Sequence, residues 1–323
     1  MFGLAFLPSP VLASTPTGYV VRADYSVPAG AGFTQYTATC NSGDFATGGG
    51  WSENIGLNTI ESLPTVGGVI ASNGATPNGW IVTTSNPTDY ALAISVLVDC
   101  MHGASVNGYV SRATYLVPAS TPPPASYTAT CNSGDFATGG GWSENIGLNT
   151  IESFPTVGGS IASNGATPNG WMATTSNPTD SALVIDVMAD CLSGSAASGY
   201  AARGDYIVPA STPPPVHYTA TCNSGDFATG GGWSENIGLN TIESLPTVGG
   251  SIASNGATPN GWTATTSNPT GSGLAISVLS DCISTVTIPT PQFSSLPLVI
   301  GIGAAVVLLA SRRALGRTKL IPA

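Results

Sequence analysis

Four acidic residues of the chain could act together in chemistry: Asp44, Glu53, Glu61 and Asp99 each recur 91 and 182 residues later. Paired carboxylates are the groups that hydrolyse glycosidic bonds. No nucleophile with a neighbouring base recurs beside them, and the chain's two histidines occupy unrelated positions of the repeat. The sequence therefore predicts a protein that is not an enzyme.

The same carboxylates are better suited to holding calcium, which prefers hard oxygen ligands. No D-x-D-x-D-G loop is present, so a calcium-stiffened stalk stays an alternative to a solvated acidic face whose members pair with Arg22. The candidate ligands are Asp44, Glu53, Glu61, Asp135, Glu144, Glu152, Asp226, Glu235 and Glu243.

Six tryptophans recur in two sets and could bind carbohydrate. Exposed indoles beside Asn and Glu stack on sugar rings, whereas a tryptophan in a small β-sandwich more often lies in the core. Three equal sugar sites on one chain would raise the apparent affinity for a polymer. The candidates are Trp51, Trp142 and Trp233, and then Trp80, Trp171 and Trp262.

These residues belong to an internal repeat with a period of 91 residues. The 49-residue block 40–88 returns at 131–179 and 222–270, with differences only at the columns of Leu63, Val69, Ile81 and Val82. Such self-similarity is typical of repeated modules. Three modules of this size account for most of the 323 residues.

Within a module, alternating apolar residues predict β-strands. In the last strand, Leu92, Ile94, Val96 and Val98 share an inner face, and Leu97 and Asp99 fall on the outer one. Gly, Pro and Asn separate several more short segments of this kind. Gly48–Gly50 has no helix pattern after it, which favours a β-bulge or a close approach to the Trp51 indole over a phosphate loop.

Each module carries one pair of cysteines, 60 residues apart. Zinc sites usually need closer pairs, so a disulfide within each module is the better interpretation. Persistent disulfides imply a compartment outside the cytoplasm. The pairs are Cys40 with Cys100, Cys131 with Cys191, and Cys222 with Cys282.

Charge excludes one class of partner. Only 7% of the residues are charged. All seventeen acidic residues precede position 293, and that part of the sequence contains only three Lys or Arg residues, all of them arginines. Nucleic-acid binding needs clustered Lys and Arg. We therefore expect no nucleic-acid partner.

Both termini fit export. Residues 1–13 form a short apolar run that ends in a small-residue cleavage pattern, as in a partial signal peptide. Residues 293–311 are uncharged, and as a helix they would span about 28 Å, close to the thickness of a hydrocarbon core. Arg312 and Arg313 follow directly, which favours a cytoplasmic tail and places the modules outside.

The segment Pro291, Gln292, Phe293, the apolar span and the basic tail resembles the C-terminal Pro-Glu-Phe sorting signal of archaeal surface proteins, with Gln292 at the position of the family's Glu. In that family a membrane-embedded transpeptidase is thought to act at the tripeptide. The resemblance implies sorting to, or anchoring at, the cell surface. The repeats resemble secreted modules with a Cys, Gly-Gly-Gly, Gly-Trp, Asn-Pro, Cys skeleton.

The sequence as a whole predicts an all-β cell-surface protein of three tandem disulfide-bonded β-sandwich repeats and a C-terminal transmembrane helix. Its expected role is structural or adhesive, with the membrane and a polymer or glycan of the cell envelope as partners. The alternatives are an extracellular carbohydrate-binding protein and the calcium-stiffened stalk. The expected parts are the signal 1–13, repeats 18–100, 108–191 and 199–282, a linker 283–292, the span 293–311 and the tail 312–323.

Overall fold

The computed structural model describes residues 16–102, 107–193 and 198–284. All the regular elements within these ranges are β-strands, and none of them is a helix that could cross a membrane. The all-β prediction is therefore confirmed for the described chain. The signal, the span 293–311, the basic tail and the Pro291–Phe293 signal lie outside the described residues.

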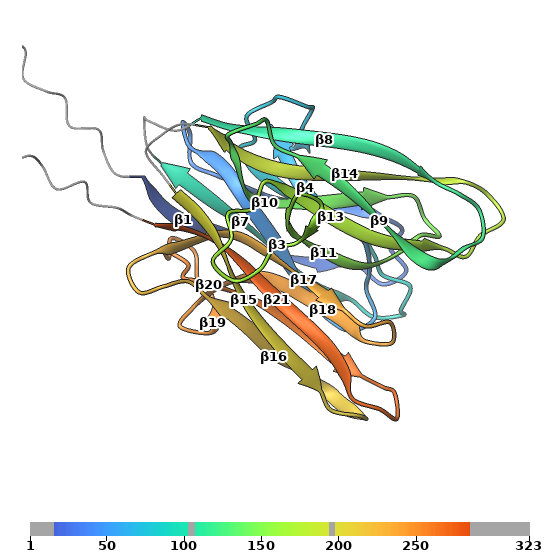
Figure 1. Ribbon diagram of the computed structural model, residues 1–323. Helices are drawn as coiled ribbons and strands as arrows, with labels where there is room; N and C mark the ends of the chain where they lie inside the picture. The colour runs from blue at the N-terminus through green and yellow to red at the C-terminus, as the bar shows by residue number, and fades with distance from the viewer. Residues whose placement is uncertain (1–15, 103–106, 194–197, 285–323) are drawn as a thin grey trace, which may run out of the picture. The chain divides into compact units, whose positions relative to one another are not determined.

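Each repeat contributes seven strands. Most of them are labelled in Figure 1. The first repeat contains β1 (Thr17–Val27), β2 (Thr34–Thr39), β3 (Phe45–Glu53), β4 (Asn58–Val66), β5 (Val69–Ile70), β6 (Gly79–Ser85) and β7 (Leu92–His102). The second contains β8 (Asn107–Val117), β9 (Thr121–Thr130), β10 (Phe136–Glu144), β11 (Asn149–Val157), β12 (Ser160–Ile161), β13 (Gly170–Asn177) and β14 (Leu183–Ser193). The third contains β15 (Ser198–Val208), β16 (Thr212–Thr221), β17 (Phe227–Glu235), β18 (Asn240–Val248), β19 (Ser251–Ile252), β20 (Gly261–Asn268) and β21 (Leu274–Ser284).

The strands of one repeat form two facing layers. In the first repeat, β1, β7 and β3 pair in one layer and β2, β6 and β4 in the other. Cys40, directly after β2, is bonded to Cys100 in β7, with 5.7 Å between the Cα atoms, so the disulfide joins the layers. The other bridges, Cys131–Cys191 and Cys222–Cys282, are equivalent, which confirms the predicted pairing within repeats.

Breaking one disulfide tests its contribution to stability. Cys40→Ala combined with Cys100→Ala should lower the free energy of unfolding by about 4 kcal/mol, because the unfolded chain regains the entropy of a 60-residue loop. Urea unfolding without reductant measures the change. The disulfide Cys131–Cys191 closes a loop of equal length. Cys131→Ala combined with Cys191→Ala should therefore lower the free energy of unfolding by the same amount. A loss below 1 kcal/mol in both pairs would contradict this account.

The apolar alternation seen in the sequence lines the space between the layers. Leu92, Ile94, Val96 and Val98 are buried there together with both cysteines, as predicted. Asp186, on the outer face of the last strand in the second repeat, pairs with Arg112 at 2.7 Å. The alternation therefore identified the inner face correctly.

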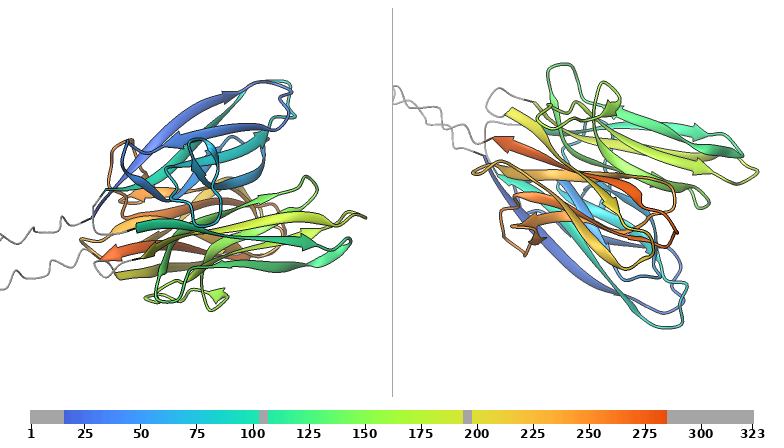
Figure 2. Two further views of the ribbon diagram at one scale, coloured as in Figure 1. Left: turned by 90° about the horizontal axis from the view of Figure 1, so that it is seen from above. Right: turned by 60° about the horizontal axis from the view of Figure 1, so that its bottom comes forward.

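Each layer continues into a neighbouring repeat, a feature that the prediction of three separate β-sandwiches did not include. The sheet order β1-β7-β3-β18-β20-β16 joins the first and third repeats, β2-β6-β4-β10-β14-β8 joins the first and second, and β15-β21-β17-β11-β13-β9 joins the third and second. In Figure 2 the blue strands of the first repeat accordingly lie beside the orange strands of the third. The three repeats thus close into a ring through three shared sheets.

The seams between repeats are short and built alike. At one seam, Trp51 is opposite Ser244 and Ser52 is opposite Glu243, whose carboxylate accepts a hydrogen bond from the Ser52 hydroxyl. A Cβ on Gly50 would lie only 1.8 Å from the Ser244 carbonyl oxygen. The two backbones can approach this closely only because the residue is glycine.

Backbone hydrogen bonds outside the sheets support the ring. Val20 in the first strand donates its N–H to Ala257 (2.9 Å) and accepts one from Gly256 (2.8 Å), both in the third repeat. Val110 makes the same pair of bonds with Gly74 and Ala75 of the first repeat. The contact that closes the ring is thus equivalent to the contacts between consecutive repeats.

One expectation about the last strand is wrong. Leu97 and Asp99 were predicted on an outward face, but they are 0% and 1% exposed. Leu97 packs against Val20, Leu245 and Ala253, two of which belong to the third repeat. The face that is outer within one repeat is therefore covered by its neighbour.

Candidate binding site

The three glycine-rich strands β3, β10 and β17 pack against one another at the centre of the ring. A Cβ on Gly48 would lie 2.5 Å from the Thr229 carbonyl oxygen, and one on Gly139 would lie 2.4 Å from that of Thr47. Thr138 donates a hydrogen bond to the same Thr47 oxygen at 2.9 Å. We call the line around which these strands pack the central axis.

These glycines confirm part of what the sequence predicted. The register shifts between Ala46 and Gly48, so a bulge lies at Thr47, directly before the glycine run. The indole that approaches is that of Trp80, 2.5 Å from a Cβ built on Gly49, and not that of Trp51. The triplet therefore serves two purposes, contact with the core through Gly49 and contact with other repeats through Gly48 and Gly50.

Three tryptophans meet at one end of the central axis. The ring centroids of Trp51, Trp142 and Trp233 are 5.3, 5.3 and 5.5 Å apart in edge-to-face geometry, an arrangement that aromatic rings favour. Each is 4% exposed, and the indoles of Trp51 and Trp233 interact with Glu53 and Glu235 of their own strands and lower the pKa of those carboxyl groups, against the larger effect of burial. One tryptophan from each repeat thus forms a single aromatic cluster, which we call the tryptophan triad.

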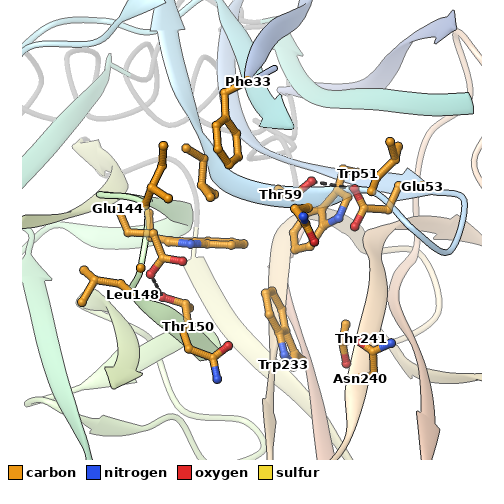
Figure 3. A pocket seen from close by; sticks show the side chains of 17 residues that line it. Phe33, Trp51, Glu53, Thr59, Glu144, Leu148, Thr150, Trp233, Asn240 and Thr241 are labelled. Carbon is orange, nitrogen blue, oxygen red and sulfur yellow. Dashed lines mark hydrogen bonds between the residues drawn. The ribbon is translucent and has the colours of Figure 1, made fainter. Parts of the chain in front are cut away.

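A pocket of about 370 Å³ lies over the tryptophan triad, and we call it the axial pocket (Figure 3). Its walls carry amide and hydroxyl groups from all three repeats and carboxyl groups from the first two. Thr59 donates to Glu53, and Thr150 donates to Glu144, each at 2.6 Å. Glu235 does not line the pocket itself but accepts a 2.6 Å hydrogen bond from the wall residue Thr241. The wall residues that matter below are Glu53, Glu144, Asn58, Asn149, Asn240, Thr59, Thr150 and Thr241.

The glutamates at the axial pocket have raised pKa values. Burial raises the pKa of Glu53 and of Glu144 to about 7 and that of Glu235 to about 8, while the threonine hydrogen bonds oppose the shift. The nearby carboxylate of Glu152 adds to the increase in the pKa of Glu235. The neutral form of these side chains is therefore favoured below neutral pH.

Three aspartates form a second acidic layer deeper in the ring. Asp99, Asp190 and Asp281 are each 1% exposed, and neither carboxyl oxygen of any of them makes a hydrogen bond within the described chain. Burial raises their pKa values well above the usual range, and Asp190 adds to the effect on the pKa of Asp281. A buried carboxyl group without partners is far less costly when it is protonated.

The six candidate tryptophans separate into two groups. Trp80, Trp171 and Trp262 are 0–1% exposed in the core, where the Trp80 indole donates to Ser62 at 2.9 Å. They cannot serve as sugar platforms, so for these three the alternative of a core position holds. The other three line the axial pocket, and because they gather in one place they do not form three separate sites.

The structure does not assemble the candidate calcium ligands. Asp44 lies just before β3 and is bound by Tyr19 and His102, both at 2.6 Å, whereas Glu53 lies at the far end of the same strand. Glu61 accepts a hydrogen bond from Thr83. Within the described ranges, no group of three or more His, Cys, Asp or Glu residues could hold a metal. The same separation applies to Asp135, Glu144, Glu152, Asp226, Glu235 and Glu243.

The alternative of a solvated acidic face is also wrong for the most buried members. Glu61 is 5% exposed, and Arg22 pairs with Asp24 at 2.7 Å instead of with one of the candidate ligands. The sequence contained one signal for the buried layer, because Asp99 stands between the apolar residues of VLVDC. It contained none for the meeting of the tryptophans. The chain matches no protein-family model, and no curated protein matches it.

Proposed function

We propose that this chain is a cell-surface protein with a structural or adhesive role, anchored by its C-terminal segment and exposing the three repeats outside the cell. The observation that carries the proposal is the closed ring with one disulfide in each repeat. Disulfides persist outside the cytoplasm, and cross-linked repeats resist unfolding there.

The direction of the strands supports an adhesive role. Gly18 lies near the start of the first strand, and a Cβ added to it would touch Phe227. Phe227 is paired with Ile283, near the end of the last strand. The first and last described residues of the three repeats therefore lie at the same end of the ring. The axial pocket lies beyond Glu53, at the other end of the nine-residue strand β3. That strand is roughly 30 Å long. A ligand can therefore enter the pocket without approaching the end at which the chain continues toward position 293.

The proposed role is non-catalytic. The described residues that line the axial pocket supply carboxyl, amide, hydroxyl and aromatic groups but no histidine, lysine or cysteine. Paired carboxyl groups alone can hydrolyse a glycosidic bond, but no other general base or activated nucleophile is among the described residues of this wall. We propose binding and no turnover at this site.

Exposure at the surface is testable on intact cells. A membrane-impermeant biotin reagent that reacts with carboxyl groups after activation should label the repeats before lysis, and a cytoplasmic marker protein should stay unlabelled. Iodoacetamide should find no free thiol in the native protein. Labelling that requires lysis, or alkylation of Cys40 or Cys100 without reductant, would overturn the proposal.

A further inference from the structure

We propose that the axial pocket is one composite binding site, shared by all three repeats, for the neutral end of a glycan. This inference rests on the adhesive role proposed above and specifies its ligand. It replaces three equivalent sugar sites, one for each repeat, by a single site for the whole chain.

The tryptophan triad requires a single site. Ring centroids 5.3–5.5 Å apart leave no room for a ligand between any two indoles, so the three can be approached only together, from the axial pocket. The pocket volume of about 370 Å³ is near the lower end of the range of roughly 300–1,000 Å³ for small-molecule sites. One or two sugar rings match that size, and a longer chain must extend out of the mouth.

The wall of the axial pocket carries carboxyl and amide groups that can hydrogen-bond to the hydroxyl groups of a sugar. Each glutamate receives its threonine hydrogen bond on Oε2, and a carboxyl group has further lone pairs that can accept a hydrogen bond from a ligand. The exposed amides of Asn58, Asn149 and Asn240 line the same space and make no hydrogen bond to the described residues there. Hydroxyls both donate and accept, so a polyol can satisfy amides and carboxyl groups at once, while its C–H faces contact the indoles.

Charge favours a neutral ligand. The described residues that line the axial pocket include no arginine or lysine, and Arg22, Arg112 and Arg203 are each paired with an aspartate elsewhere. An acidic sugar would meet the carboxyl groups of Glu53 and Glu144 and no cation. A positively charged amino sugar would also gain little from ion pairing. Burial raises the pKa of these two glutamates to about 7 and so favours their neutral form.

The experiment uses the full-length chain in detergent. It is screened on an array of glycans that end in neutral hexoses or N-acetylhexosamines, alongside the same structures ending in uronic acid or sulfate. The best neutral glycan is then titrated calorimetrically. We expect binding to neutral ends only, with one ligand for each chain.

Asn58→Ala, Asn149→Ala and Asn240→Ala together should weaken that binding about tenfold or more, because several ligand hydrogen bonds are lost. The matched control replaces Asn41, Asn132 and Asn223 by Ala. These asparagines are also exposed but precede β3, β10 and β17, at the other end of those strands. The control should bind as the parent does, and both variants should keep the parent's near-UV circular dichroism.

Four results would overturn the inference: no neutral glycan bound, three ligands for each chain, preference for acidic ends, or unchanged affinity in the pocket variant. Because the purified protein is used, failure here leaves the surface labelling of the repeats unaffected. Surface labelling with no glycan binding would therefore reject this site alone, whereas glycan binding by a protein labelled only after lysis would reject the proposed location.

Discussion

The free energy of unfolding of the repeats should fall steadily as the pH rises from about 4 to about 8. The pKa values of Glu53, Glu144 and Glu235 are raised from 4.5 to about 7, 7 and 8 in the folded chain. The folded state therefore binds more protons than the unfolded state across this window, and stability decreases with pH. Full stabilisation exists below the unfolded pKa and is lost as pH passes the folded values.

The effect should be large. A shift of one pKa unit corresponds to about 1.4 kcal/mol, so each glutamate loses on the order of 3 kcal/mol between pH 4 and pH 8. The buried aspartates Asp99, Asp190 and Asp281 act in the same direction, since burial raises their pKa values too. Below about pH 4 the trend should reverse, because hydrogen bonds from Ser95 and Arg22 lower the pKa of Asp24, whose contribution is lost on protonation.

Urea unfolding at pH 4, 6 and 8, followed by tryptophan fluorescence, measures this dependence. Glu53→Gln, Glu144→Gln and Glu235→Gln together keep a neutral group of similar shape and should remove much of the slope. Asp89→Asn with Asp180→Asn is the control, because both residues are exposed in loops. Stability that increases from pH 4 to pH 8 would contradict the assignment of these carboxyl groups as neutral acids.

Replacing one seam glycine should destabilise the entire ring. In Gly50→Ala the new Cβ would lie 1.8 Å from the Ser244 carbonyl oxygen, and in Gly141→Ala it would lie 1.9 Å from that of Ser62. Backbone atoms cannot move aside as a flexible side chain can, so strands β3 and β18, or β10 and β4, must separate. We expect a loss of about 3 kcal/mol or more for each substitution.

The cooperativity of unfolding distinguishes a ring from independent modules. Calorimetry of Gly50→Ala should show one transition at lower temperature for all three repeats, and Gly141→Ala should behave alike at its own seam. Gly32→Ala is the matched control, because no atom lies within 4 Å of its added Cβ. A variant in which two repeats keep the parent's transition while one melts early would show that the shared sheets contribute little.

Local features of the fold followed from local chemistry. The alternation of Leu92, Ile94, Val96 and Val98 was enough to identify an inner face, since side chains along a strand point to alternate sides. The equal spacing of the cysteines was enough to pair Cys40 with Cys100, because close metal-type pairs were lacking. These conclusions depend on a single repeat and needed no knowledge of what surrounds it.

The arrangement of the repeats was decided only by the tertiary structure. Because the 49-residue blocks are nearly identical, the segment around Trp51 is as complementary to Ser62 of its own repeat as to Ser244 of the third, with which it pairs. Alternation likewise reports which face of a strand is apolar and not what covers the other, so Asp99 could not be placed inside. Local sequence therefore determined strands and disulfides, whereas closure of the ring brought the tryptophans, glutamates and aspartates to one axis.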